Sequence, residues 1–91
     1  MPLNPTFDVC AGATASAGST TLTFTNNHST ACTITGLGNL VDCGNSFTVP
    51  ARANGTAGTK TCNIKSNAST GNYSYSASVC SQGGNPVIIY Q

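Results

Sequence analysis

The feature that most constrains the fold is a strict alternation of side chains near the C-terminal end. From Tyr73 to Val79, apolar residues occupy every odd position and serines occupy the even positions between them. A period of two is typical of a strand with one buried face. A loop rich in Gly and Asn follows at residues 81–86, and the apolar run at residues 87–90 predicts a second strand.

The same alternation recurs along the chain. Further strands are predicted at residues 6–10, 20–25, 32–35, 47–50 and 59–64. The intervening segments are predicted as loops at residues 11–18 and 51–58 and as an irregular or short-strand segment at residues 36–44. No apolar residues recur at helical spacing over a useful length. The sequence therefore predicts an all-β fold, a single Greek-key β-sandwich of about seven or eight short strands.

The length of the chain limits the number of domains, and its charge limits the classes of partner. The 91 residues form one domain, 1–91, in which residues 1–5 are expected to be a flexible N-terminal segment. Only 5% of the residues are charged, against roughly 25% in soluble domains, and 34 residues are Ser, Thr or Asn. We therefore expect neither nucleic acid nor anionic membranes as partners, because both are captured by clustered Lys and Arg. A net charge of +1 gives little repulsion between copies, which favours self-association.

The five cysteines indicate an oxidising compartment. Small secreted domains use disulfides to supplement a limited core, so the chain is expected to be secreted or displayed at the cell surface. The chain has no Cys-x-x-Cys pair and His28 is its only histidine, which argues against structural zinc. No apolar run approaches the length of a membrane helix, so no membrane insertion is expected.

Few residues of the chain are candidates for a catalytic or binding site. His28 lies in a polar turn and is expected to be a solvated loop residue rather than a metal ligand. Nucleophilic catalysis by a triad and catalysis by paired carboxylates both need acidic residues, and Asp8 and Asp42 are the only ones in the chain. No enzyme activity is therefore predicted. The three tyrosines could form a sugar-stacking platform, but at strand spacing Tyr73 and Tyr75 are expected to pack inward more often. The tyrosines are Tyr73, Tyr75 and Tyr90.

Two short segments resemble a known family. Residues 24–27 (FTNN), with Cys32 a few positions on, are similar to the strand and turn that deliver the first copper-ligating His of cupredoxins. Residues 71–75 (GNYSY) are similar to the Gly-x-Tyr-x-Phe/Tyr strand that leads into the remaining ligands of that family. The resemblance covers roughly residues 20–91 and implies a cupredoxin- or immunoglobulin-like sandwich.

The copper ligands implied by the resemblance are absent. The four family positions fall on Cys32, Ala77, Cys80 and Asn85. A blue-copper site needs a thiolate, two imidazoles and a weak axial ligand. Because Ala77 replaces the thiolate and neither imidazole position holds His, we predict no copper and no other cofactor.

The resemblance implies a disulfide in place of the metal. Cys32 and Cys80 both fall on positions that would touch one copper ion, so the resemblance implies a Cys32–Cys80 bond. Cys43 and Cys62 then form the second pair, although other connectivities remain open. Cys10 is left over. It is expected either as a small buried hydrophobe or as a free thiol, which would be reactive or would link two subunits.

These expectations favour a non-catalytic role. The first hypothesis is a structural or adhesive module, secreted or at the cell surface, that meets copies of itself in an oligomer or filament, or meets other surface proteins. The alternatives are a copper-binding or redox protein of cupredoxin descent and a carbohydrate-binding module.

Overall fold

A computed structural model describes residues 3–80 and 85–91 of the chain. Throughout this part the fold is all-β, as the alternation predicts, and it contains no helix that could span a membrane. The strands are β1 (Thr6–Asp8), β2 (Ala13–Ala15), β3 (Thr21–Asn26), β4 (Cys32–Thr35), β5 (Ser46–Val49), β6 (Gly58–Asn63), β7 (Gly71–Ser74), β8 (Ser76–Ala77) and β9 (Val87–Tyr90).

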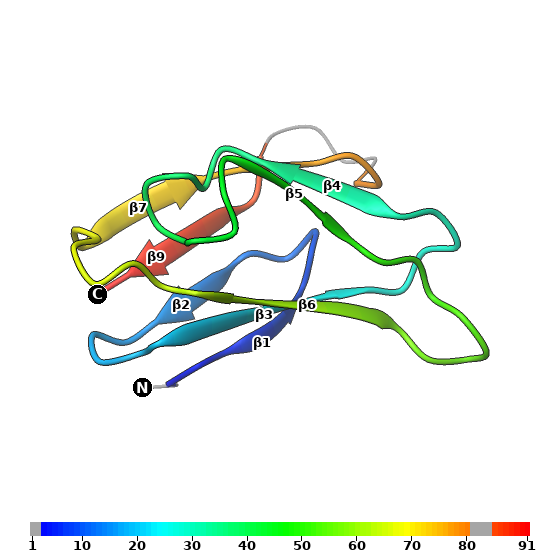
Figure 1. Ribbon diagram of the computed structural model, residues 1–91, viewed down its shortest axis with the longest axis horizontal. Helices are drawn as coiled ribbons and strands as arrows, with labels where there is room; N and C mark the ends of the chain where they lie inside the picture. Colours follow the sequence, from blue (N-terminus) through cyan, green and yellow to red (C-terminus); the bar gives the residue numbers. More distant parts are fainter. Residues whose placement is uncertain (1–2, 81–84) are drawn as a thin grey trace.

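The strands form two layers (Figure 1). The first layer is a sheet with the order β1-β3-β6, in which β1 runs parallel to β3 and β6 antiparallel to it. The second layer holds two sheets, with the orders β2-β9-β7 and β5-β4-β8. Only Tyr75 separates β7 from β8, so one continuous stretch of backbone pairs first with β9 and then with β4. This stretch joins the two sheets of the second layer.

The core lies between the layers and is centred on aromatic rings. Phe24 of β3 is fully buried and makes edge-to-face contacts with three rings, with centroid distances of 4.8 Å to Phe7, 5.2 Å to Phe47 and 6.1 Å to Tyr75. Phe47 and Tyr75 belong to the second layer, so Phe24 ties the layers together. Aromatic pairs of this geometry contribute about 0.5–1.5 kcal/mol each beyond the area they bury.

The predicted strand faces are confirmed. Leu22 and Phe24 are buried, while Thr21, Thr23 and Thr25, which alternate with them, are half-exposed. Tyr75 is buried, and Ser74 and Ser76 on either side of it are exposed. Cys32 and Ile34 share the buried face of β4, as the alternation predicts. These three strands therefore place their apolar residues on the core side, whereas Ile89 of β9 is an exposed apolar residue.

The structure has more strands than predicted, for two reasons. Residues 11–18 were predicted to be a loop, but β2 forms there and pairs in parallel with β9. Gly12, with φ at +69°, permits this, because a Cβ at that position would collide with the backbone of Val87. The predicted single strand at residues 73–79 divides at Tyr75 because its two halves pair with different neighbours.

Asn4 attaches the start of the described chain to the first layer. Its side-chain oxygen accepts hydrogen bonds from the backbone amides of Thr20 (2.8 Å) and Thr21 (3.1 Å), next to the start of β3. The backbone amide of Asn4 donates a hydrogen bond to the Ser19 hydroxyl at 3.2 Å. Within the predicted flexible segment 1–5, Asn4 is therefore bonded to the body of the domain.

Candidate functional site

The positions that the resemblance assigns to copper do not form the predicted bond. Cys80 is joined to Cys10, with a Cα–Cα distance of 5.5 Å. Cys32 is a buried free thiol at the start of β4. The predicted Cys32–Cys80 bond is therefore wrong, and so are both expectations for Cys10.

Local hydrogen bonds position the Cys10–Cys80 disulfide. After β1 the chain turns toward the second layer, and the Asp8 carboxylate accepts a hydrogen bond from the Cys10 amide at 2.9 Å. On the other side, the Cys80 amide donates to the Ala77 carbonyl at 3.1 Å, which closes the turn after β8. The bond thus links the crossover after β1, in the first layer, to the turn after β8, in the second.

The predicted Cys43–Cys62 bond is confirmed, with a Cα–Cα distance of 5.6 Å. It fastens the irregular segment at residues 36–45 to β6. The Asp42 side chain reinforces this attachment, because its carboxylate accepts hydrogen bonds from the Asn63 backbone amide (3.0 Å) and side-chain amide (3.1 Å).

Cys32, rather than Cys10, is the unpaired cysteine of the chain. Its side chain has no exposed surface and shares the core face of β4 with Ile34. A buried thiol in apolar surroundings behaves as a small hydrophobe and is shielded from oxidants and metals. The spare thiol is therefore part of the core and does not form a surface linkage.

The remaining metal candidates are scattered. Ala77 pairs with Ile34 in the sheet, and Asn85 is exposed. His28 is exposed in the turn after β3, where its backbone carbonyl accepts a hydrogen bond from the Arg52 amide at 2.8 Å. Among the described residues, no three His, Cys, Asp or Glu side chains gather as a metal site would require.

The three tyrosines occupy different environments, so they do not form one platform. Tyr75 is buried, and its hydroxyl donates to the Val9 carbonyl at 2.9 Å. Burial raises the pKa of the Tyr75 hydroxyl above its usual value, and the nearby Asp8 carboxylate adds to this effect. Tyr73 and Tyr90 are half-buried and pack against the edge of the core.

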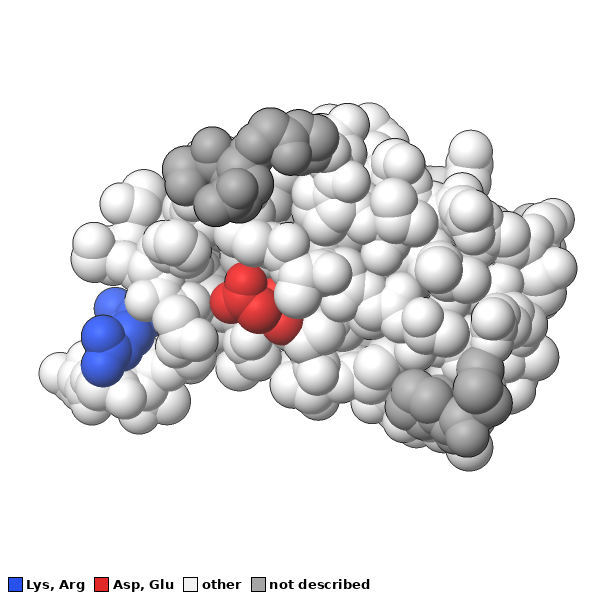
Figure 2. Space-filling model, turned by 180° about the vertical axis from the view of Figure 1, so that it is seen from behind, with Lys and Arg blue, Asp and Glu red and all other residues white. Residues whose placement is uncertain are grey.

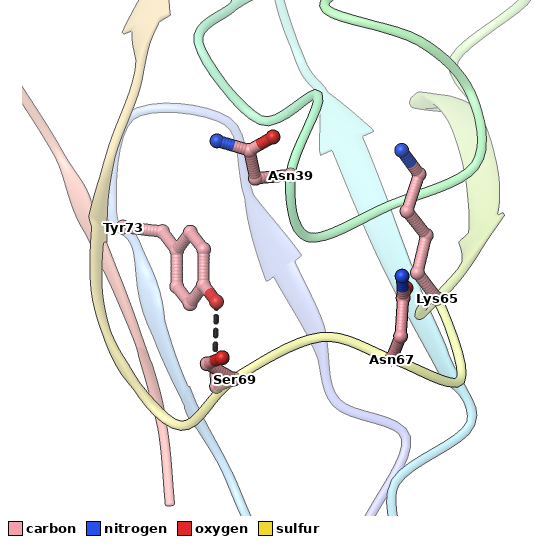
Figure 3. A pocket seen from close by; sticks show the side chains of 5 residues that line it. All are labelled: Asn39, Lys65, Asn67, Ser69 and Tyr73. Carbon is pink, nitrogen blue, oxygen red and sulfur yellow. Dashed lines mark hydrogen bonds between the residues drawn. The ribbon is translucent and has the colours of Figure 1, made fainter.

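Tyr73 lines a polar hollow that the sequence did not predict. The hollow has a volume of about 390 Å³ and is lined by Asn39, Lys65, Asn67, Ser69 and Tyr73 (Figure 3). These residues come from three segments: the loop before β5, the loop before β7, and β7 itself. Of the five lining residues, only Tyr73 is a candidate binding residue by sequence, because nothing in the sequence pattern indicates that the two loops meet.

Two of the three sheets, β1-β3-β6 and β5-β4-β8, present rows of hydroxyl groups on their outer faces. The β4 hydroxyl face is exposed and consists of Thr33, Thr35, Ser46, Thr48 and Ser76. The β3 hydroxyl face is half-exposed along β3 and consists of Thr21, Thr23, Thr25, Thr59 and Thr61. Figure 2 shows one side of the molecule on which charged atoms occupy only small areas between uncharged residues.

Comparisons with protein-family models, with curated proteins and with solved structures each found no match to this chain.

Proposed function

We propose that this domain is a non-catalytic structural or adhesive module, secreted or displayed at the cell surface, that associates with copies of itself or with other surface proteins. The observation that carries the proposal is the β4 hydroxyl face. It presents an uncharged row of hydroxyl groups on one sheet, and the face is exposed along its length.

The chemistry of this face suits contact with another protein surface. Thr33 lies directly opposite Thr48, and Thr35 lies between Ser46 and Ser76 across the sheet. A hydroxyl group both donates and accepts hydrogen bonds, so two copies of the face can satisfy each other in a two-fold arrangement. Hydroxyl groups also lose less solvation free energy on burial than charged groups do.

The two disulfides support the extracytoplasmic part of the proposal. Disulfides persist in oxidising compartments and are rare in the cytosol. Cys10–Cys80 spans 70 residues and Cys43–Cys62 spans 19, so together they constrain most of the chain. A module that functions outside the cell gains resistance to unfolding from such bonds.

Light scattering across a range of protein concentrations tests the proposal. We expect the average mass to rise reversibly with concentration, because the described surface presents little charge to repel a second copy. We expect the same rise when the thiol is blocked with an alkylating agent, because the only free thiol in the structure is the buried Cys32. A strictly monomeric protein at high concentration would remove the self-assembly version of the proposal.

A further inference from the structure

The polar hollow beside Tyr73 is held in shape by the two loops that form it. The Lys65 backbone amide donates to the Leu40 carbonyl at 2.9 Å, and its ammonium group donates to the Gly38 carbonyl at 2.6 Å. The Ala68 amide donates back to the Lys65 carbonyl at 3.0 Å. The two hydrogen bonds from Lys65, one from its backbone and one from its side chain, thus fix the loop before β7 against the loop before β5.

The Tyr73 ring forms one wall of the hollow. Tyr73 is half-buried in β7, and its hydroxyl donates to the Ser69 carbonyl, which holds the ring in place. Figure 3 shows the ring on one side of the hollow and the side chains of Lys65 and Asn67 on the other. The ring therefore presents a fixed apolar surface next to polar groups.

The other side chains supply uncommitted hydrogen-bonding groups. An ammonium group has three donors, and Lys65 uses one of them on Gly38. Asn39 and Asn67 are exposed, and neither amide side chain is hydrogen-bonded to another described residue. None of the five lining residues is acidic, so Lys65 gives the hollow a positive potential.

We propose that this hollow binds one unit of an acidic saccharide. The carboxylate pairs with Lys65, the sugar hydroxyls bond to the amides of Asn39 and Asn67, and the apolar C–H face of the sugar ring packs on Tyr73. The volume of about 390 Å³ lies at the small end of the range for ligand pockets, which fits a single sugar ring. This inference rests on the adhesive version of the proposed function and names its ligand class.

Titration with sodium glucuronate and, in parallel, with glucose tests the inference. The amide signals of residues around the hollow are followed by NMR. We expect glucuronate to shift signals from Lys65, Asn67 and Tyr73, and we expect glucose to bind at least about tenfold more weakly because it lacks the carboxylate. Added salt should weaken glucuronate binding, since it screens the ion pair.

Two matched variants separate the pocket from general charge effects. Lys65→Gln should raise the dissociation constant for glucuronate about tenfold or more, while Lys60→Gln, with the same change in charge on β6, should leave it unchanged. Tyr73→Phe keeps the ring and should retain binding. Thermal unfolding of each variant establishes that it is folded.

Three results would overturn the inference: equal affinity for glucose and glucuronate, no binding of either sugar, or an equal loss in both lysine variants. None of these depends on self-association. Light scattering on the same samples therefore distinguishes a failure of the sugar site from a failure of the structural role.

Discussion

Asn26 is a polar residue without exposed surface, at the last position of β3. Its side-chain nitrogen donates to the carbonyls of Thr30 (2.9 Å) and Pro50 (3.2 Å), and its oxygen accepts a hydrogen bond from the His28 amide at 3.0 Å. One side chain thus closes the β3–β4 turn and ties it to the end of β5. The cost of burying the amide is offset by these three bonds.

Replacing the Asn26 side chain should destabilise the folded state. We expect Asn26→Ala to lower the free energy of unfolding by about 3 kcal/mol, because three partly buried hydrogen bonds are lost. Asn27→Ala, at the exposed neighbouring position, is the control and should change stability by less than about 0.5 kcal/mol. Urea unfolding of both variants measures the difference, and similar effects of the two changes would contradict the role assigned to Asn26.

Tyr75 makes the stability of the domain depend on alkaline pH. Its folded-state pKa is raised, chiefly by burial, whereas in the unfolded chain it titrates near about 10. Below that pH both states keep the proton and the full contribution is present. Above it the unfolded chain loses the proton while the native state keeps it, so the free energy of unfolding falls by up to about 1.4 kcal/mol per pH unit.

Tyr75→Phe should remove this component of the pH dependence. At neutral pH the variant should be about 1 kcal/mol less stable than the wild type, because the hydrogen bond to Val9 is lost. Above pH of about 10, its stability should fall less steeply than that of the wild type. Denaturant unfolding at a series of pH values checks both effects, and Tyr73→Phe serves as the control. A variant whose curve runs parallel to the wild type would rule out Tyr75 as the group responsible.

At the scale of elements, the two disulfides fasten different parts of the sandwich. Cys10–Cys80 joins the crossover after β1 to the turn after β8 and encloses 70 residues. Cys43–Cys62 joins the segment before β5 to β6 and encloses 19. The chain-entropy model assigns the larger stabilisation to the longer loop.

Removing each pair should therefore have unequal effects. We expect Cys10→Ala/Cys80→Ala to lower the free energy of unfolding by about 4 kcal/mol and Cys43→Ala/Cys62→Ala by about 3 kcal/mol. Guanidinium unfolding of the two double variants gives the comparison. If the second variant proves clearly less stable than the first, loop length does not determine the ranking in this fold.

The free thiol gives an independent check of connectivity. In the native protein we expect no labelling by a thiol reagent, because Cys32 has no exposed surface. In denaturant without reductant, one thiol per chain should react, and peptide mapping should place the label on Cys32. A label on Cys10 would instead restore the bond between Cys32 and Cys80.

The alternating pattern of the strands explains both what could be predicted from the sequence about the fold and what could not. The alternation around Phe24 and Tyr75 reports which face of a strand is buried, and the structure confirms both assignments. It does not report which strands are neighbours. The Cys10–Cys80 bond and the formation of β2 both depend on where the chain goes after Asp8, and the small residues of that segment carry no periodic signal.

The hollow beside Tyr73 shows the same limit at a candidate site. Tyr73 could be identified from sequence as a candidate sugar-stacking residue. Lys65 and Asn39 could not be placed near it, because the hydrogen bonds that join the two loops run from Lys65 to backbone carbonyls, those of Leu40 and Gly38. Backbone groups are common to every residue and leave no signature in the sequence.

At the scale of the whole molecule, the low charge determines how copies can meet. The net charge is +1 and only 5% of the residues are charged, so long-range repulsion and attraction are both weak. Salt acts on such interactions by screening them. Association through the β4 hydroxyl face should therefore be nearly independent of ionic strength in the wild-type protein.

A charge placed on that face should impose salt dependence. Thr48 is exposed on β5, opposite Thr33, so in Thr48→Lys two associating copies bring like charges together. We expect the dissociation constant for self-association to rise at least about tenfold at low salt and to recover partly at high salt, as the repulsion is screened. Thr61→Lys adds the same charge to the β3 hydroxyl face, on the opposite layer, and should behave like the wild type. Light scattering at low and high salt measures all three proteins. An equal effect of both lysines would show that charge alone controls association, and an effect confined to Thr61→Lys would move the contact to the β3 hydroxyl face.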